Sequence, residues 1–246
     1  NNLRGKIDFY FETLIVDLKF NNNEWILTSK TGDKFISKYL ICATNLLLHK
    51  RSLKILNINE TPLRKAIPIH EDKKIDLLLN FLSNQSFIPR LTFLIYTNEN
   101  YSYKDTYSKK YRYFHLKKNL ENKYKFERII FQLQENNNLG IVVHTKNKDF
   151  INSYIKTKDE HFFKQTIFEN FNKLFSNNSS VNQLTSYEGI SIMKWRASQP
   201  SGYPIPLSLQ YSEKSRIGFC GDWFEGEGFG RIEGSILSAL TLEEKF

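Results

Sequence analysis

The most informative segment of the sequence is Ile217-Gly-Phe-Cys-Gly221-Asp222-Trp-Phe-Glu-Gly226-Glu-Gly228-Phe-Gly230-Arg231-Ile-Glu-Gly234-Ser-Ile-Leu-Ser-Ala-Leu240. The apolar run from Ile217 to Cys220 has the length of a buried strand, and it stops at Gly221-Asp222. Glycines follow, and then apolar residues at helical spacing: Ile232, Ile236, Leu237 and Leu240. This order predicts a strand, a glycine-rich loop and a helix, which together form half of a βαβ unit. In open α/β sheets, ligands bind beyond the carboxyl ends of the strands, at such loops.

The predicted loop has two possible roles. A helix N-terminus offers unpaired N–H groups and a partial positive charge, which suit a phosphate or an electron-rich ring. Asp222, at the end of the strand, can accept hydrogen bonds from sugar or ribityl hydroxyls. The alternative is a tight turn whose glycines serve only to adopt positive φ angles. The residue types alone leave these two interpretations equal, because an isolated glycine-rich loop is a weak signal.

The full string resembles the C-terminal FAD-binding motif of the amine-oxidase-like flavoproteins, especially their renalase-type branch. That motif has an apolar strand, Gly-Asp, a short variable loop, and Gly-x-apolar-Glu-Gly-small before the last helix. This chain has Cys220-Gly221-Asp222 and later Gly230-Arg231-Ile232-Glu233-Gly234-Ser235. It departs from the branch at Ser238-Ala239, where Ser-Gly is usual. The resemblance implies FAD as the cofactor and the following residues as its contacts: Gly221, Asp222, Trp223, Gly230, Arg231 and Ile232.

Length and composition indicate a folded globular chain. Its 246 residues suffice for one large domain or two modest ones, and aromatic residues are abundant. No apolar run is long enough to span a bilayer, and no secretory signal is visible. The two cysteines, Cys42 and Cys220, do not form a disulfide framework and favour a reduced intracellular setting, so we expect a cytoplasmic location.

The N-terminal part of the sequence lacks an expected motif. Met193 is the only methionine, so Asn1 is not a translation start. Flavoproteins of this kind begin with a Gly-x-Gly-x-x-Gly loop that holds the pyrophosphate of FAD, and no such loop occurs near Asn1. We therefore expect that an N-terminal segment of about half a typical domain is missing and that activity requires it.

Residues 1–48 predict a β-meander followed by a buried strand. Ile7, Phe9 and Phe11 alternate with polar residues and predict a strand that extends to Phe20. Turn residues separate three strands at Asn21–Asn23 and at Thr31–Asp33. The continuous apolar run from Tyr39 to Thr44 is typical of a buried strand in a parallel sheet.

A meander followed by a strand that ends in Ala-Thr resembles a second segment of the same flavoproteins. The resemblance implies that a backbone group of Ile15 meets the adenine, because Ile15 and Leu18 match an apolar pair of the family. It also implies that Ala43 and Thr44 pack near the adenosine or the pyrophosphate. From the residues alone, Ile15 and Leu18 are more simply explained as core side chains.

The middle of the chain predicts a mixed region with strands at 90–97, 126–134, 140–144 and 187–196 and helices at 76–82 and 158–175. The long helix predicts an inward apolar face made of Phe162, Phe163, Ile167, Phe168, Phe171, Leu174 and Phe175. The hairpin before this helix resembles the substrate domain of the renalase-type branch. Trp195-Arg196-Ala197 with a nearby proline resembles the segment that leads back to the flavin, which makes Trp195 a candidate for the substrate cavity.

Residues 98–128 interleave lysine, arginine and tyrosine. On such a surface, the aromatic rings can stack on the bases of single-stranded nucleic acid and the basic side chains can neutralise its phosphates. A solvated sheet with lysines at its edges is the favoured explanation, because no RNA-binding motif is present. The net charge of +9 leaves nucleic acid and acidic membranes open as partners on charge alone. No His-x-x-x-His or Cys-x-x-Cys pattern occurs, so we expect no metal site.

These observations predict an α/β chain (α+β overall) of two domains. Residues 1–48 and 205–246 would form a partial Rossmann-like FAD-binding domain with a β-meander, and residues 49–204 an inserted mixed-sheet substrate domain. The resemblance implies an FAD-dependent oxidoreductase that transfers a hydride to flavin N5 from a small amine-like or reduced nicotinamide-like substrate. No acid–base side chain stands out as catalytic. Two alternatives remain open: an interaction module of the same fold without FAD, and a basic protein that binds single-stranded nucleic acid.

Overall fold

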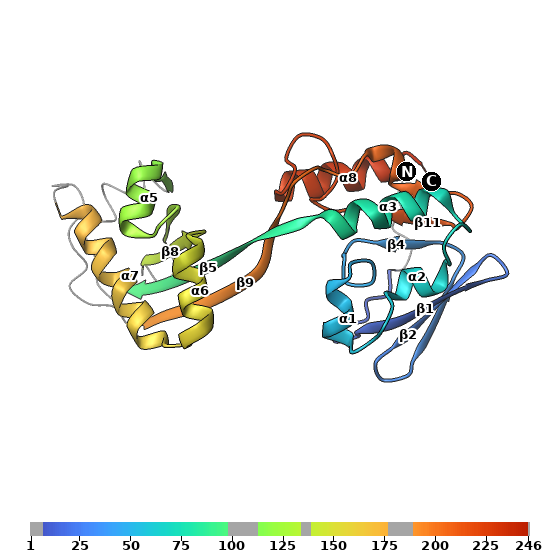
Figure 1. The fold of residues 1–246 in the computed structure, drawn as a ribbon, viewed down its shortest axis with the longest axis horizontal. Helices are drawn as coiled ribbons and strands as arrows, with labels where there is room; N and C mark the ends of the chain where they lie inside the picture. The colour runs from blue at the N-terminus through green and yellow to red at the C-terminus, as the bar shows by residue number, and fades with distance from the viewer. Residues whose placement is uncertain (1–6, 98–112, 134–138, 177–188, 246) are drawn as a thin grey trace. The chain divides into compact units, whose positions relative to one another are not determined.

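The structure is a computed structural model that describes residues 7–97, 113–133, 139–176 and 189–245. The chain forms two compact units, one made of Asn1–Ser86 with Pro200–Phe246 and the other of Phe87–Gln199. It passes from the first unit to the second through β5 (Ser86–Thr97) and returns through β9 (Gly189–Ser201) (Figure 1). Residues 49–86 thus lie in the first unit, whereas the sequence analysis grouped them with the second.

The first unit contains the expected β-meander. Strands β1 (Ile15–Asn21), β2 (Glu24–Ser29) and β3 (Lys34–Ser37) form an antiparallel sheet in that order. Asn22 and Asn23 make the first turn with φ angles of 52° and 64°. These left-handed angles suit asparagine and match the twist of a hairpin. The two turns and the strand order confirm the meander.

The start of the first strand differs from the prediction. Ile7, Phe9 and Phe11 are exposed and lie outside any strand, and β1 begins only at Ile15. Ile15 is also where the pairing of β1 with Ser29 of β2 begins. The alternation in residues 7–11 was read as a strand, but a strand needs a partner for its backbone groups, and β2 has ended before it reaches them.

A second sheet of the first unit carries a parallel strand pair. Its order is β10 (Tyr211–Ser212), β11 (Ile217–Phe219) and β4 (Leu40–Cys42). β4 and β11 run parallel, with Leu40 opposite Ile217 and Cys42 opposite Phe219. This pairing confirms the prediction that the apolar run after the meander contains a parallel strand, in which Leu40 and Cys42 are buried. β4 is the outer strand of the described sheet, and Ile41 at its centre is 53% exposed.

Helices complete the first unit: α1 (Arg51–Leu56), α2 (Pro62–Ala66), α3 (Lys73–Asn84), the short 3-10 helix η1 (Leu207–Leu209) and α8 (Ile232–Glu243). Asp72 caps α3 by accepting hydrogen bonds from the backbone N–H groups of Lys74 and Ile75. Its other carboxylate oxygen accepts hydrogen bonds from the hydroxyls of Ser212 and Ser215, so one side chain joins the helix to β10. Strand and helix side chains share one apolar core that includes Leu18, Trp25, Leu40, Cys42, Leu63, Ile67, Leu78, Ile217 and Phe219.

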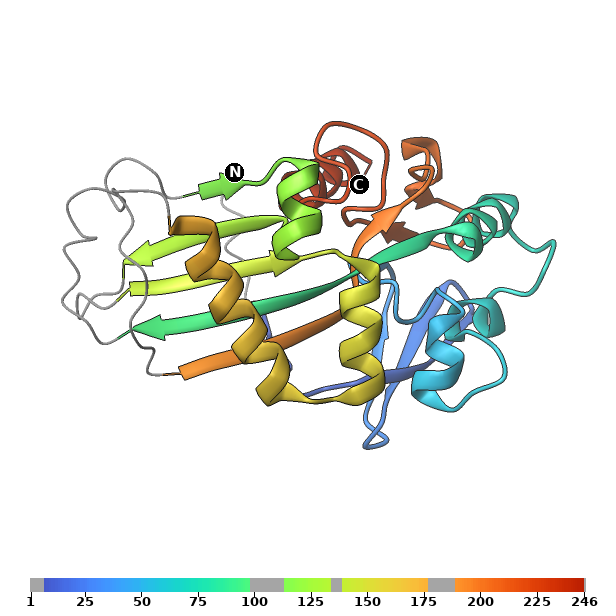
Figure 2. The same cartoon turned by 60° about the vertical axis from the view of Figure 1, so that its left-hand side comes forward.

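The second unit is a five-stranded sheet with helices on one face (Figure 2). The strand order is β6 (Tyr113–His115), β7 (Arg128–Leu133), β8 (Leu139–Thr145), β5 and β9. The covering helices are α5 (Lys118–Tyr124), α6 (Lys148–Thr157) and α7 (Glu160–Phe175). The antiparallel pairing of β7 with β8 confirms the expected hairpin.

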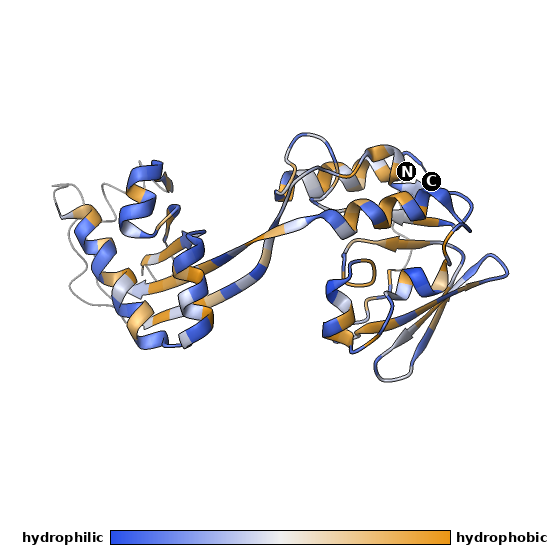
Figure 3. Cartoon of the chain, viewed as in Figure 1, coloured by the Kyte–Doolittle hydropathy of each residue, from blue (hydrophilic) through white to orange (hydrophobic). Residues whose placement is uncertain are grey.

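The core of the second unit lies between the sheet and these helices, and apolar residues line the inner side of the helices (Figure 3). Phe163, Ile167, Phe171 and Phe175 of α7 are buried there, as expected. Phe162 was expected to face inward as well, but its side chain is 55% exposed and stacks on the edge of Phe163. Of the lysine- and tyrosine-rich stretch 98–128, residues 98–112 lie outside the described residues.

Candidate cofactor site

The two parallel strands of the first unit end side by side. The backbone N–H of Cys220 donates to the carbonyl of Cys42 over 3.2 Å, directly beyond the last paired residues. Ala43 and Thr44 therefore leave β4 next to Gly221 and Asp222, which leave β11. The carboxyl edge of parallel strands is where α/β sheets bind ligands. The structure thus brings together four of the residues that the sequence analysis proposed as cofactor contacts.

The glycine-rich loop folds back on the helix that follows it. The Gly230 N–H donates to the Asp222 carbonyl over 2.7 Å, and the Arg231 N–H donates to the Gly228 carbonyl over 2.8 Å. Gly228 has a φ angle of 82° and lies against Gly234 in the first turn of α8, so closely that neither position has room for a Cβ atom. The glycines therefore serve two needs, a left-handed turn and a close backbone contact.

Ser238 holds the start of the loop, a role that the sequence analysis did not identify. Its hydroxyl accepts a hydrogen bond from the Gly221 N–H over 2.8 Å and lies 3.0 Å from the Gly221 carbonyl. Gln210 donates to the Ser238 carbonyl from the other side. The sequence signal that could have indicated this contact is a small polar residue inside the apolar pattern of the last helix.

Asp222 lies half-buried at the entrance of the loop, and this burial raises the pKa of its carboxyl. Its own backbone N–H partly offsets that effect through a hydrogen bond that lowers the pKa. A partly desolvated carboxylate with spare lone pairs is suited to accept hydrogen bonds from hydroxyl groups of a ligand.

The N-terminus of α8 is open. Arg231 is its N-cap residue and makes no side-chain hydrogen bond to the first turn, whose N–H groups have no partners within the helix. Ile232, the first helical residue, is 80% exposed. A cavity of about 390 Å³ lies alongside this turn, and its lining residues are Glu227, Gly228, Arg231, Glu233, Ile236 and Leu237. This end of α8 can therefore receive a group that accepts hydrogen bonds.

The remaining predicted contacts lie elsewhere. Trp223 is buried in the core with its ring against Gly221, and its indole N–H has no acceptor among the described residues. Ile15 lies in the meander sheet, separate from the sheet of β4 and β11. Trp195 lies on β9 of the second unit, with 47% of its side chain exposed. Their contacts with a cofactor or substrate stay predictions.

Cys42 is the last residue of β4, and Cys220 directly follows β11, next to the loop. Burial raises the pKa of the Cys42 thiol to about 12, with a smaller effect from Cys220. Burial also raises the pKa of the Cys220 thiol. Both thiols are therefore protonated near neutral pH, which makes them packing residues rather than nucleophiles.

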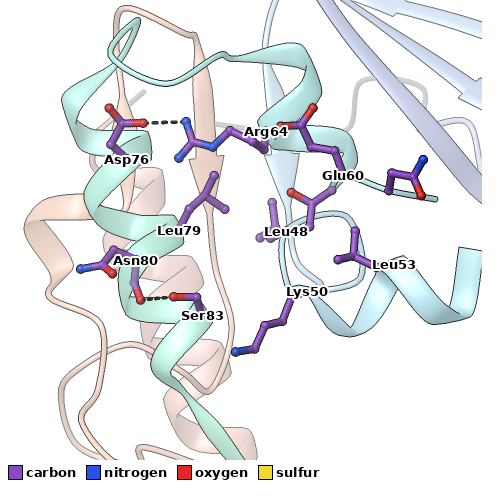
Figure 4. A pocket seen from close by; sticks show the side chains of 11 residues that line it. Leu48, Lys50, Leu53, Glu60, Arg64, Asp76, Leu79, Asn80 and Ser83 are labelled. Atoms are coloured by element: carbon purple, nitrogen blue, oxygen red, sulfur yellow. Dashed lines mark hydrogen bonds and ion pairs between the residues drawn. The ribbon is translucent and has the colours of Figure 1, made fainter.

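A second cavity of the first unit, of about 420 Å³, lies among α1, α2 and α3 (Figure 4). Arg64 of α2 and Asp76 of α3 form an ion pair of 2.6 Å on its wall, and the hydrogen bond from Arg64 lowers the pKa of Asp76. Leu48, Leu53 and Leu79 give it an apolar floor. The sequence analysis did not predict this cavity. Among the described residues, no group of three or more His, Cys, Asp or Glu side chains could hold a metal ion.

Comparisons with known proteins identify the fold. No family model and no curated protein matches the chain by sequence. Solved structures do match. Cyclohexylamine oxidase from Brevibacterium oxydans gives a TM-score of 0.59 at 9% identity, over 94% of this chain and 48% of that one. Wild-type putrescine oxidase bound to putrescine gives a TM-score of 0.60 at 11% identity, over 95% of this chain and 48% of that one. An oxidoreductase from Methanosarcina mazei gives a TM-score of 0.58 at 12% identity, over 94% of this chain and 49% of that one.

The chain therefore shares its fold with these oxidases over nearly its whole length, which confirms the predicted α/β fold class. It spans about half the length of the structures that it matches. Among the described residues, no helix is long and apolar enough to cross a membrane.

Proposed function

We propose that this chain belongs to an FAD-dependent oxidoreductase that acts on a small amine-like or reduced nicotinamide-like substrate. One observation carries the proposal: the ends of the parallel strands β4 and β11, the glycine-rich loop and the open N-terminus of α8 meet at the carboxyl end of this strand pair. The likeness in fold to two amine oxidases supports an oxidoreductase and favours the amine over the nicotinamide. The renalase-type branch remains a finer proposal from the motif alone.

The residues present fit a dinucleotide with a ring system. Glycine at positions 228 and 234 lets the loop backbone lie directly on the first turn of α8, and the side chain of Arg231 makes no capping hydrogen bond there. Asp222 offers a carboxylate for the ribityl hydroxyls, and exposed Ala43 and Thr44 leave room beside it. In this proposal, Gly221, Asp222, Gly230, Arg231 and Ile232 hold the flavin end.

When FAD is bound, it supplies the hydride acceptor, so the protein needs to position and stabilise rather than react. The first N–H groups of α8 and the dipole of this helix favour negative charge beside them, and such fixed dipoles are usually a large contribution to catalysis. Ser238 keeps the Gly221 peptide in place beneath them. Trp195 is proposed as a wall of the substrate cavity.

We further propose that activity requires a segment with the Gly-x-Gly-x-x-Gly loop. This requirement is supported by the observation that the chain covers only about half the length of the similar oxidases, and by two features of the structure. β4 is an outer parallel strand with Ile41 exposed, although parallel strands are normally flanked and covered. The apolar side chains of α8 are also exposed: Ile232, Ile236, Leu237 and Leu240. A strand along β4 and a helix against α8 would cover both.

The test is the flavin content of the protein produced from its complete reading frame. We expect a yellow protein whose FAD absorbance is released on denaturation, and a several-fold lower FAD content in the variant Asp222→Ala. A colourless protein that folds would refute the proposal and favour the interaction module. Unchanged FAD content in Asp222→Ala would refute the role of Asp222 alone.

A further inference from the structure

The sheet of the second unit has a second face whose chemistry the proposed cofactor site does not use. Leu91, Phe93 and Ile95 of β5 point into the core beneath the helices. Side chains alternate along a strand, so Arg90, Thr92 and Leu94 lie on the opposite face. In the described part of the chain, the helices of this unit all pack on the first face (Figure 2).

Three cations converge on one carboxylate at the end of this opposite face. Glu127 forms ion pairs with Arg90, with Lys146 over 3.1 Å and with Arg128 over 3.7 Å. The side chains of Arg90 and Glu127 are only 5% and 6% exposed, whereas those of Arg128 and Lys146 are 28% and 33% exposed. The buried pair forms the base of the cluster, and the two outer cations are accessible to solvent.

The cluster carries more positive than negative charge. Glu121 also acts on Arg90, but it has its own partner, Lys118, at 3.3 Å. The four cations and two carboxylates leave an excess of two positive charges. Burial and the neighbouring Arg128 lower the pKa of Arg90 to about 10. Burial, Arg128 and Arg90 lower the pKa of His144 to about 4, so this ring stays neutral near pH 7.

The geometry leaves donors available on the outer cations. The Nε of Arg128 is buried and faces Glu127, so the exposed part of this side chain is the rest of its guanidinium group. Arg128 lies in register with His144, and His144 with Thr92, so the three side chains form one row across the face. The next row is apolar and consists of Ile130, Val142 and Leu94, all partly exposed. The two rows are about 7 Å apart, the repeat of alternate residues along a strand.

We propose that Arg128 and Lys146 bind the carboxylate of a small ligand whose apolar part lies on Ile130, Val142 and Leu94. A guanidinium matches the two oxygens of a carboxylate and binds it through paired charge-assisted hydrogen bonds. A bound carboxylate also offsets the excess charge of the cluster, which otherwise holds a buried arginine beside two other cations. Because the apolar row lies only about 7 Å from the row of Arg128, the ligand favoured is one whose carboxylate is attached directly to its apolar part.

The charge of the site sets the class of ligand. A face with excess positive charge repels a diamine. It accepts a molecule that carries a carboxylate on an apolar body.

Isothermal titration calorimetry of the full chain with phenylacetate tests the site, and 2-phenylethylamine serves as the cationic counterpart. We expect phenylacetate to bind more tightly than the amine. Its affinity falls at least about tenfold in Arg128→Gln and in Lys146→Gln, because each removes a charge-assisted hydrogen bond. Lys148→Gln, an exposed lysine two residues from Lys146, is the control and leaves the affinity unchanged. Near-ultraviolet circular dichroism confirms that each variant is folded.

A second measurement separates binding from loss of structure. Phenylacetate should raise the pKa of His144 in NMR titrations of wild-type protein, because the added negative charge offsets Arg128. Absent binding, equal affinity for the two probes, or affinities that both substitutions leave intact would overturn the proposal. FAD content is measured on the same preparations. A protein that binds phenylacetate but lacks FAD contradicts the proposed function and supports the carboxylate site. A protein that contains FAD but does not bind phenylacetate supports the proposed function and contradicts the carboxylate site.

Discussion

Gly228 and Gly234 meet backbone to backbone: a Cβ on Gly234 would lie 2.3 Å from the Gly228 carbonyl oxygen. We predict that Gly234→Ala destabilises the protein by about 1–3 kcal/mol, because the added methyl group forces the loop off the helix. Urea unfolding measures this change. Ser235→Ala, at the next position of the same helix, is the control. If the two variants unfold at the same urea concentration, the close contact between Gly228 and Gly234 does not contribute to stability.

The raised pKa of Asp222 gives stability a pH dependence. Burial disfavours its charged form, so Asp222 lowers stability above its folded pKa, and the loss diminishes as pH falls through that value. We predict that Asp222→Asn is more stable than wild type near neutral pH and that the difference shrinks in acid. Thermal unfolding at several pH values between neutral and about pH 4 checks this. A difference in Tm that is constant across this range would contradict it.

The buried carboxylate of Glu127 is expected to be important for the second unit. Glu127→Gln removes the partner of a buried arginine, and breaking such a pair typically costs about 3–5 kcal/mol. Glu169→Gln is the matched control, since its pair with Lys173 is 3.6 Å long and exposed, and such pairs contribute about 1 kcal/mol or less. Denaturant unfolding of both variants provides the comparison. Similar losses would show that Arg90 has enough other partners.

The exposed face of α8 leads to a prediction for the protein produced from its complete reading frame. Leu237→Asp should lower both its FAD content and its Tm, because we propose that a further segment covers this leucine. Leu77→Asp is the control, because Leu77 on α3 is similarly exposed at 51% and has no proposed partner. Absorbance at the flavin band and differential scanning fluorimetry measure the two quantities. If both variants behave like wild type, the α8 face is not covered.

Local patterns were enough to predict the elements that build the candidate site. The continuous apolar runs before Ala43 and Gly221 indicated buried strands, and the first run also indicated a parallel strand, which its pairing with the second confirms. The same reasoning failed at Ile7, Phe9 and Phe11, because alternation shows that a strand is possible and not that a partner strand is present. Phe162 was misplaced because its neighbour Phe163 already occupies the inward position on the helix.

The contacts that hold the site together could not be predicted in the same way. Ser238 acts on Gly221 from a different element, and Gln210 reaches Ser238 from a third. The charge cluster around Glu127 likewise joins residues from three strands and their ends, spread between positions 90 and 146. A single sequence does not show which residues such contacts join, even where a polar residue in an apolar helix pattern, such as Ser238, indicates that some contact exists. They follow only once strand order and register are known.

The two ends of the inserted unit meet at a single point of the first one. The hydroxyls of Ser86 and Ser201 lie 2.6 Å apart, so the chain leaves and re-enters at nearly the same place. In evolutionary terms, such a junction makes the intervening region exchangeable: a turn of a few residues could replace it without altering the path of the remaining chain. A fold assembled in this way can change the inserted unit and keep the rest of the chain as it is.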